Sequence, residues 1–148
     1  MGNFLARHKL TRVMNAVAAG TTDQNSSSVN MAGFEEVTFI AAFGVITGSA
    51  VTSIRVQTSS DDGSSDSWTD ILGSDITVAD DDDNQIVAVT IRKPLEQYLR
   101  CTVKRATQNA VIDGVIAIQS GAGTRATTHD SSSVVGTEIH VSPAEGTA

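Results

Sequence analysis

Cysteine, proline, aromatic residues and long apolar runs are all scarce in this sequence. Its 148 residues include one cysteine and two prolines, and aromatic residues make up 4% of the chain. The single cysteine, Cys101, excludes an intramolecular disulfide. No apolar run approaches the roughly 20 residues that a membrane-spanning helix needs, so we expect no membrane partner. The N-terminal segment also lacks the apolar stretch of a signal peptide, because Arg12 and Asn15 interrupt it.

Basic residues are few and unevenly placed. The chain has ten Lys and Arg and 17 Asp and Glu, which gives a formal net charge of −7. This excess of acid argues against a nucleic-acid partner, because such binding relies on a broad basic surface. Between Arg55 and Arg92 there is no Lys or Arg and there are many Asp, whereas the N-terminal residues are basic. A basic arm on an acidic body predicts oriented binding to charged partners.

What the chain has in quantity is short runs of β-branched and apolar residues between polar turns. Residues 53–58 and 98–105 alternate between apolar and polar side chains, while residues 35–43 are apolar almost throughout. Gly114 interrupts the most apolar run and predicts a bulge or a close backbone contact. With no convincing long helix, the pattern predicts an all-β fold, an antiparallel β-sandwich or jelly-roll-like domain. The expected strands lie at 35–43, 53–58, 67–72, 75–79, 84–92, 98–105 and 111–119.

The two ends of the chain read as extended arms. Residues 1–30 form an N-terminal arm and linker, because neither helical nor strand periodicity persists there. The β-sandwich domain is expected over 31–120. Residues 121–148 form a Ser/Thr/Gly-rich C-terminal arm that is either flexible or ordered by a partner. Its segment TEIHV, 137–141, could add one strand to a neighbouring subunit.

Four consecutive aspartates, Asp80 to Asp83, precede the apolar run IVAVTI. A calcium loop spaces its oxygen ligands at alternate positions, whereas adjacent side chains in an extended stretch point in opposite directions. We therefore favour a solvated turn that delimits two strands and protects the following strand from aggregation. A cation site using two or three of these carboxylates is the alternative.

No other motif supports catalysis or a cofactor. The histidines, His8, His129 and His140, lack the spacing of a zinc site. Cys101 alternates with core residues, so we expect a buried, inert thiol. There is no G-x-S-x-G elbow and no Gly-rich loop that opens a helix, although a dispersed Ser-His-Asp site stays open. We expect no enzyme activity, no cofactor and no metal.

Two interpretations are possible for each of three large side chains, Trp68, Arg100 and Arg105. Trp68 either covers one end of the sandwich core, which we favour, or offers a platform for a sugar ring. Arg100 and Arg105 project from one strand. They could pair with the acidic region 61–83 within the chain or across a subunit contact.

Most of the chain, residues 31–119, resembles a group of small structural proteins of tailed bacteriophages, the head decoration or cement proteins and similar minor virion components. The resemblance lies in NMAGFEEVTFIAAFG, VQTSSDDGSSDSWTDILGS, VADDDDNQIVAVTI, RKPLEQYLRCTVKR and NAVIDGVIAIQSGAG, and the ending HVSPAEGTA agrees with it. It implies a β-sandwich on the outer surface of the head, commonly a homotrimer, made in the host cytoplasm. Such a protein binds the major capsid protein and braces neighbouring capsid subunits.

The N-terminal arm supplies the expected contacts to that partner. Its apolar and basic side chains suit anchoring on an acidic capsid surface, because an ordered arm must bury apolar groups or gain contacts to offset its lost entropy. Two other functions are kept open. One is a head–tail junction or tail component, and the other is a surface carbohydrate-binding module using Trp68 and the acidic loops. The expected partner-binding residues are Phe4, Leu5, Arg7, Lys9 and Arg12.

Overall fold

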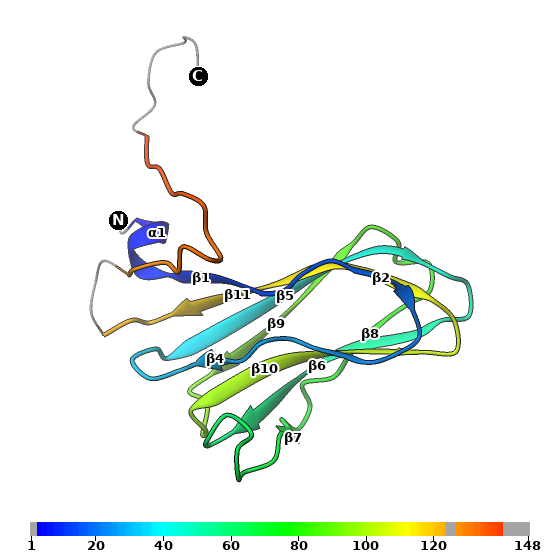
Figure 1. Ribbon diagram of the computed structural model, residues 1–148, viewed down its shortest axis with the longest axis horizontal. Coiled ribbons are helices and arrows are strands. Elements are labelled where there is room, and N and C mark those ends of the chain that lie inside the picture. The colour runs from blue at the N-terminus through cyan, green and yellow to red at the C-terminus, as the bar shows by residue number, and fades with distance from the viewer. Residues whose placement is uncertain (1–2, 124–126, 141–148) are drawn as a thin grey trace.

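The computed structural model describes residues 3–123 and 127–140 and contains two antiparallel sheets packed face to face (Figure 1). The first sheet has the strand order β1-β11-β5-β9, and β2 also pairs with β11. It consists of β1 (Lys9–Met14), β2 (Val17–Gly20), β5 (Glu36–Ile46), β9 (Ile86–Arg92) and β11 (Ala110–Ser120).

The second sheet has the order β3-β10-β6-β7, with β4 also on β10 and β8 also on β6. A short helix, α1 (Phe4–Arg7), precedes β1. The prediction of an all-β antiparallel sandwich is confirmed. The strands of the second sheet are β3 (Gln24–Asn25), β4 (Val29–Asn30), β6 (Val51–Ser59), β7 (Thr69–Asp70), β8 (Ile76–Val78) and β10 (Tyr98–Ala106).

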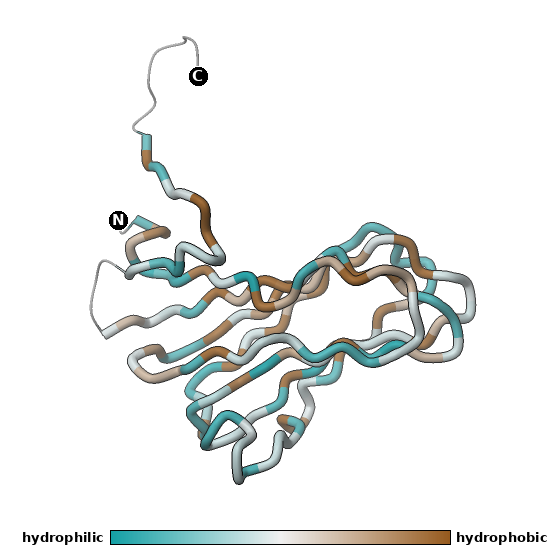
Figure 2. The backbone as a smooth tube through the Cα atoms, viewed as in Figure 1, coloured by the Kyte–Doolittle hydropathy of each residue, from teal (hydrophilic) through white to brown (hydrophobic). Residues whose placement is uncertain are grey.

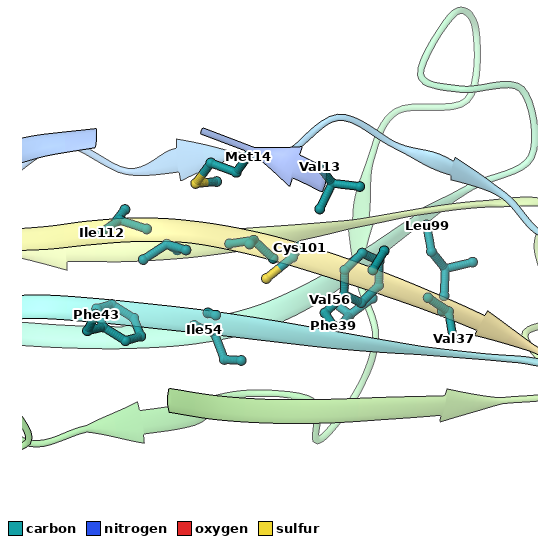
Figure 3. Close-up of a cluster of buried hydrophobic side chains, with 14 of the residues drawn as sticks. Val13, Met14, Val37, Phe39, Phe43, Ile54, Val56, Leu99, Cys101 and Ile112 are labelled. Carbon is teal, nitrogen blue, oxygen red and sulfur yellow. The ribbon is translucent and has the colours of Figure 1, made fainter. Parts of the chain in front are cut away.

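The core lies between the two sheets and is built by alternation along the long strands. On β5, Phe39 and Phe43 point inward, and on β10, Leu99 and Cys101 do the same. Figure 3 shows these side chains filling the space between the strands. Burial raises the pKa of the Cys101 thiol to about 12, so this group stays protonated and unreactive at neutral pH. The expected inert, buried cysteine is confirmed.

The expected irregularity at Gly114 is also present. The pairing of β11 with β5 shifts between Ile112 and Gly114, as a β-bulge requires. Gly114 has φ +142, and a Cβ placed there would lie 3.1 Å from the carbonyl oxygen of Met14. A side chain at this position would therefore be strained and crowded by β1.

The N-terminal segment differs from the expected arm. Residues 9–30 supply four strands, and β1 pairs with β11 along its length, with Leu10 opposite Ile118 and Arg12 opposite Ile116. Val13 and Met14 are buried in the core. The strand pattern is hard to see in the sequence because the register shifts between Arg12 and Met14 and because only two residues separate β1 from β2. The sandwich therefore begins at Lys9 instead of residue 31.

Candidate interaction surfaces

The outer face of the first sheet is apolar. On β5 the buried residues alternate with Thr38, Ile40 and Ala42, and on β9 the inward valines alternate with Ile86 and Ala88. Ile116 and Ile118 of β11 and Leu10 of β1 lie on the same side. We call the following set the apolar face: Leu10, Ile40, Ala42, Ile86, Ala88, Ile116 and Ile118.

Strand register joins these side chains into one continuous surface. Ile116 lies opposite Ile40, which in turn lies opposite Ala88, so one row crosses three strands. Directly opposite side chains in a sheet are neighbours, with Cβ atoms roughly 5 Å apart. Exposure is substantial, since Ile86 is 70% exposed and Ile116 is 46% exposed. A contiguous exposed apolar area of this kind marks an interaction site more often than chance.

Polar side chains border the apolar face at one end. The hydroxyls of Thr38 and Thr90 lie 2.8 Å apart across β5 and β9. One row further on, Arg92 forms an ion pair with Glu36, with Nε and Oε2 3.1 Å apart. Arg12 lies on the β1 side, opposite Ile116. An apolar centre with a polar rim is the usual anatomy of a protein–protein interface.

The outer face of the second sheet has the opposite character. Arg55 pairs with Asp70, and Lys104 pairs with Asp23 at 2.5 Å. Arg100 donates through Nε to the side-chain oxygen of Gln57 at 2.9 Å. These charged and polar groups are partly exposed and are paired with one another. The outer face of an antiparallel sandwich is normally polar because water covers it. The second sheet follows this rule, whereas the aliphatic outer face of the first sheet does not.

The five residues expected to bind a partner lie on α1 and β1, next to the apolar face. Phe4 is 49% exposed and its ring stacks on His8 with centroids 4.3 Å apart. Leu5 is half-buried, and its backbone N–H donates to the Asn3 side chain that caps the helix. Arg7 and Arg12 are exposed, while Lys9 is partly buried within β1.

The C-terminal segment 127–133 packs along the outer edge of β1, which the sequence did not reveal. His129 accepts through Nδ1 from the backbone N–H of Leu10 at 3.2 Å, and its Nε2 lies 3.1 Å from the carbonyl oxygen of Leu5. Ser133 accepts from the N–H of Arg12 at 2.5 Å. Side chains of the tail thus satisfy the free N–H groups of this edge strand. Part of the expected C-terminal arm is therefore ordered by its own N-terminus.

Asp130 contributes to the same contact. Hydrogen bonds from the backbone and side chain of Ser132, together with the positive charge of Lys9, hold the pKa of Asp130 below its usual value. Lys9 is thereby partly engaged within the chain. The basic surface at α1 and β1 is therefore formed together with residues 127–133.

The loop of Asp80 to Asp83 accepts hydrogen bonds from the backbone, which neither interpretation of the sequence included. Asp83 accepts from the backbone N–H of Ile46 at 2.6 Å, and Asp80 accepts from the N–H of Ser49. Asp82 accepts from the N–H of Ala79 at 2.9 Å. These carboxylates hold the turn between β5 and β6 against the loop before β9. Over residues 3–123 and 127–140, no group of three or more His, Cys, Asp or Glu is placed to hold a metal ion.

Trp68 lies outside the core, which corrects the interpretation that we favoured. It is half-buried on the rim of the loop that connects β6 and β7, and the guanidinium of Arg100 lies 4.5 Å from its ring centroid. A Cβ at Gly63 would collide with the Trp68 ring. The loop itself is held by Asp61, which accepts from the backbone N–H groups of Ser64 and Ser65. One ring face is thus covered by Arg100.

Arg105 points inward, although we expected it to project from its strand. It is 3% exposed and donates to the carbonyl oxygens of Thr22 and Ala18, both at 2.9 Å, and of Ala110 at 2.7 Å. Its parity along β10 is that of the buried Leu99, Cys101 and Val103. Arg105 therefore fixes the N-terminal strands to the sandwich, and its acidic neighbour is Asp23.

The comparisons with known proteins establish a fold relationship. The structure resembles that of the PBSX exported protein XepA, with a TM-score of 0.53 and 15% sequence identity. The match covers 98% of this chain and 46% of XepA, so the chain spans less than half the length of that protein. No family model matches the sequence. A search of curated proteins also found no match. In the described part of the chain, no helix has the length and apolarity to cross a membrane.

Proposed function

We propose that this protein is a structural component of a phage particle and binds a neighbouring virion protein through its apolar face. The observation that carries the proposal is the difference between the two outer faces of the sandwich. One is charged and internally paired, and the other is a row of exposed aliphatic side chains such as Ile86 and Ile116. Burying aliphatic surface stabilises an interface by roughly 25 cal/mol per Å².

The fold likeness supports a phage origin. XepA is a phage PBSX exported protein, and its fold covers nearly the whole of this chain. The sequence resemblance to decoration proteins points the same way. Together they favour a protein whose contacts, and not a reaction, constitute its function.

The partner we propose is the major capsid protein, with this chain on the outer surface of the head as a cement protein. Of the basic residues near the start of the chain, Arg12 lies on the same side of β1 as Leu10, opposite Ile116 of the apolar face, whereas Lys9 lies opposite the buried Gln119 and points to the other side. An acidic capsid surface would orient the chain through these charges and bury the aliphatic side chains beside them. Symmetric repetition, such as a homotrimer, would add avidity to contacts that are weak individually.

Imaging of purified particles at subunit resolution tests this proposal. We expect many copies bridging capsid subunits, each with the apolar face buried. A single ring at one vertex would place the chain at the head–tail junction or tail instead. If the chain is absent from particles, the structural proposal is wrong.

A pair of variants tests the face itself. Ile116→Glu introduces a charge into the centre of the apolar face, whereas Thr69→Glu adds the same charge to an exposed position of the second sheet. Each variant is added to particles that lack the protein, and the bound amount is measured. We expect binding to fall for Ile116→Glu and to be retained for Thr69→Glu.

A further inference from the structure

Strand β9 presents an open backbone edge. Phe43 donates through its N–H to the carbonyl of Gln85 at 3.0 Å, and Lys93 donates to the carbonyl of Glu35 at 2.7 Å. Hydrogen-bonded pairs alternate in an antiparallel ladder, so odd-numbered residues of this strand direct their backbone groups toward β5. The even-numbered residues Ile86, Ala88, Thr90 and Arg92 direct theirs away from it. Of the strands described, only β5 pairs with β9.

Within the strand itself, this edge has few of the features that normally prevent strand addition, because the aspartates that we expected to protect it, Asp80 to Asp83, lie before β9 begins. Edge strands are usually protected by charges, prolines or a covering segment. In β9 the sequence IVAVTI is uncharged, and Arg92 stands only at its end. Among the residues that the structure describes, the tail segment 127–133 protects the opposite edge, at β1.

Two hollows lie along the open edge of β9, between it and the second sheet. One is lined by Val78, Ile86 and Val87. The other is lined by Leu72 and Leu95, both of which are fully exposed, and by the basic residues Arg92 and Lys93, among others. A strand added to β9 would direct alternate side chains toward these hollows.

The chain carries a segment with the pattern of such a strand. From residue 135 to 140, Val135, Thr137 and Ile139 alternate with Gly136, Glu138 and His140. One face is therefore entirely β-branched, which favours a strand, although these residues pair with no strand in the structure. Val135 is fully exposed and Ile139 is 64% exposed. Figures 1 and 2 show this segment leading away from the sandwich, with an apolar stretch in it.

The segment cannot reach β9 of its own chain. Ser133 is held at Arg12, outside β1, and the open edge lies beyond β11, β5 and β9. Crossing these strands spans roughly five inter-strand intervals of about 4.8 Å, or about 24 Å. At about 3.4 Å per extended residue, the crossing uses about seven residues, which is the whole of 134–140. No residue of the segment would remain to lie along β9.

We propose that residues 135–140 of one copy add as a strand to the open edge of β9 in a second copy. Val135 and Ile139 would fill the two hollows, and Glu138 would lie on the outer side near Arg92 and Lys93. The opposite charges of these residues favour this arrangement over addition with the faces reversed. Because donor and acceptor are different surfaces, two copies either exchange this strand reciprocally in a closed dimer or associate head-to-tail in a ring or an open chain. This self-association goes beyond the proposed function and does not depend on the capsid partner.

Sedimentation of the full chain over a range of concentrations tests the inference. The donor variant is Val135→Asp with Ile139→Asp, and its matched control is Val135→Ile with Ile139→Val. We expect the donor variant to weaken self-association roughly a hundredfold, because two buried aliphatic contacts are lost, and the control to resemble the wild type. Both side chains are exposed, so we expect the donor variant and its control to fold as the wild type does.

The acceptor edge is tested independently with Ala88→Pro and its control Ala88→Val. Proline is tolerated at an edge position whose N–H faces away from the sheet, but it removes a donor that an added strand needs. We expect Ala88→Pro to fold, by circular dichroism, and to lose self-association. A wild-type chain that stays monomeric at the highest concentration would overturn the proposal. Association that survives the donor variant would overturn it as well and would assign self-contact to another surface, such as the apolar face.

Discussion

Replacing Asp83 by alanine should destabilise the fold, although four adjacent acids look like a merely solvated loop. Asp83 accepts from the backbone N–H of Ile46 at 2.6 Å, and Ile46 is a buried residue of the core. Hydrogen bonds to a charged group contribute about 1.5–3 kcal/mol. Asp83 is itself exposed, so water can partly replace its oxygen in the variant. We therefore expect a loss near the lower end of that range, about 1.5 kcal/mol.

This loss corresponds to a melting temperature lowered by roughly 3–6 °C for a domain of this size. Differential scanning calorimetry measures it directly. Asp81→Ala is the matched control, because Asp81 is exposed and no hydrogen bond to its side chain is present among the described residues. Its effect should stay within about 0.5 kcal/mol. Asp83→Asn, which keeps an acceptor oxygen, should fall between the two.

Two results would refute this account of the loop. Equal destabilisation by Asp81→Ala and Asp83→Ala would mean that general charge, and not the contact to Ile46, matters. A calcium-dependent rise in melting temperature that is lost in Asp81→Asn with Asp82→Asn would mean that the loop holds a cation. A loop held by hydrogen bonds requires that neither occurs.

Individual contacts elsewhere in the fold lead to three more predictions. Trp68→Ala should cost about 1–2 kcal/mol in urea denaturation, and not the roughly 3–5 kcal/mol of a core tryptophan, because the ring packs mainly on Arg100. The hydrogen bond from Lys104 lowers the pKa of Asp23. The contribution of this ion pair to stability is therefore present at neutral pH and is lost as the pH falls through the lowered pKa. Asp23→Asn should reduce the acid sensitivity of the melting temperature. His129→Ala should speed hydrogen exchange at the Leu10 amide, measured by NMR, without affecting core amides.

The long strands were predictable because their signal is local and repeated. In β6 and β10, every second side chain is buried over most of nine residues, so periodicity alone locates the strands and their inner faces. The bulge at Gly114 was predictable for a related reason, since a glycine inside an apolar strand usually marks a bulge or a close backbone approach. The same parity rule would have placed Arg105 in the interior. A preference for solvated arginine led to the opposite interpretation.

The remaining features depend on contacts between residues far apart in the sequence. Strand β1 is a short edge strand whose register shifts, so no persistent period identifies it. The tail docks through single side chains, His129 and Ser133, which leave no pattern in the sequence. Asp83 meets Ile46 across 37 positions. Such pairings are set by the tertiary fold, and composition cannot reveal them.

The apolar face can be traced to the sequence of strand β5. Strand β5 is apolar on its inner side throughout and aliphatic on the central part of its outer side, at Ile40 and Ala42, beyond the polar Glu36 and Thr38. The core covers the side of Phe39, whereas no strand or helix of the described residues pairs over the side of Ile40, which belongs to one of the two layers seen in Figure 1. Among the described residues, the aliphatic part of this outer face lacks a second layer that would bury it. The physical content of the proposed function is that another protein supplies that layer.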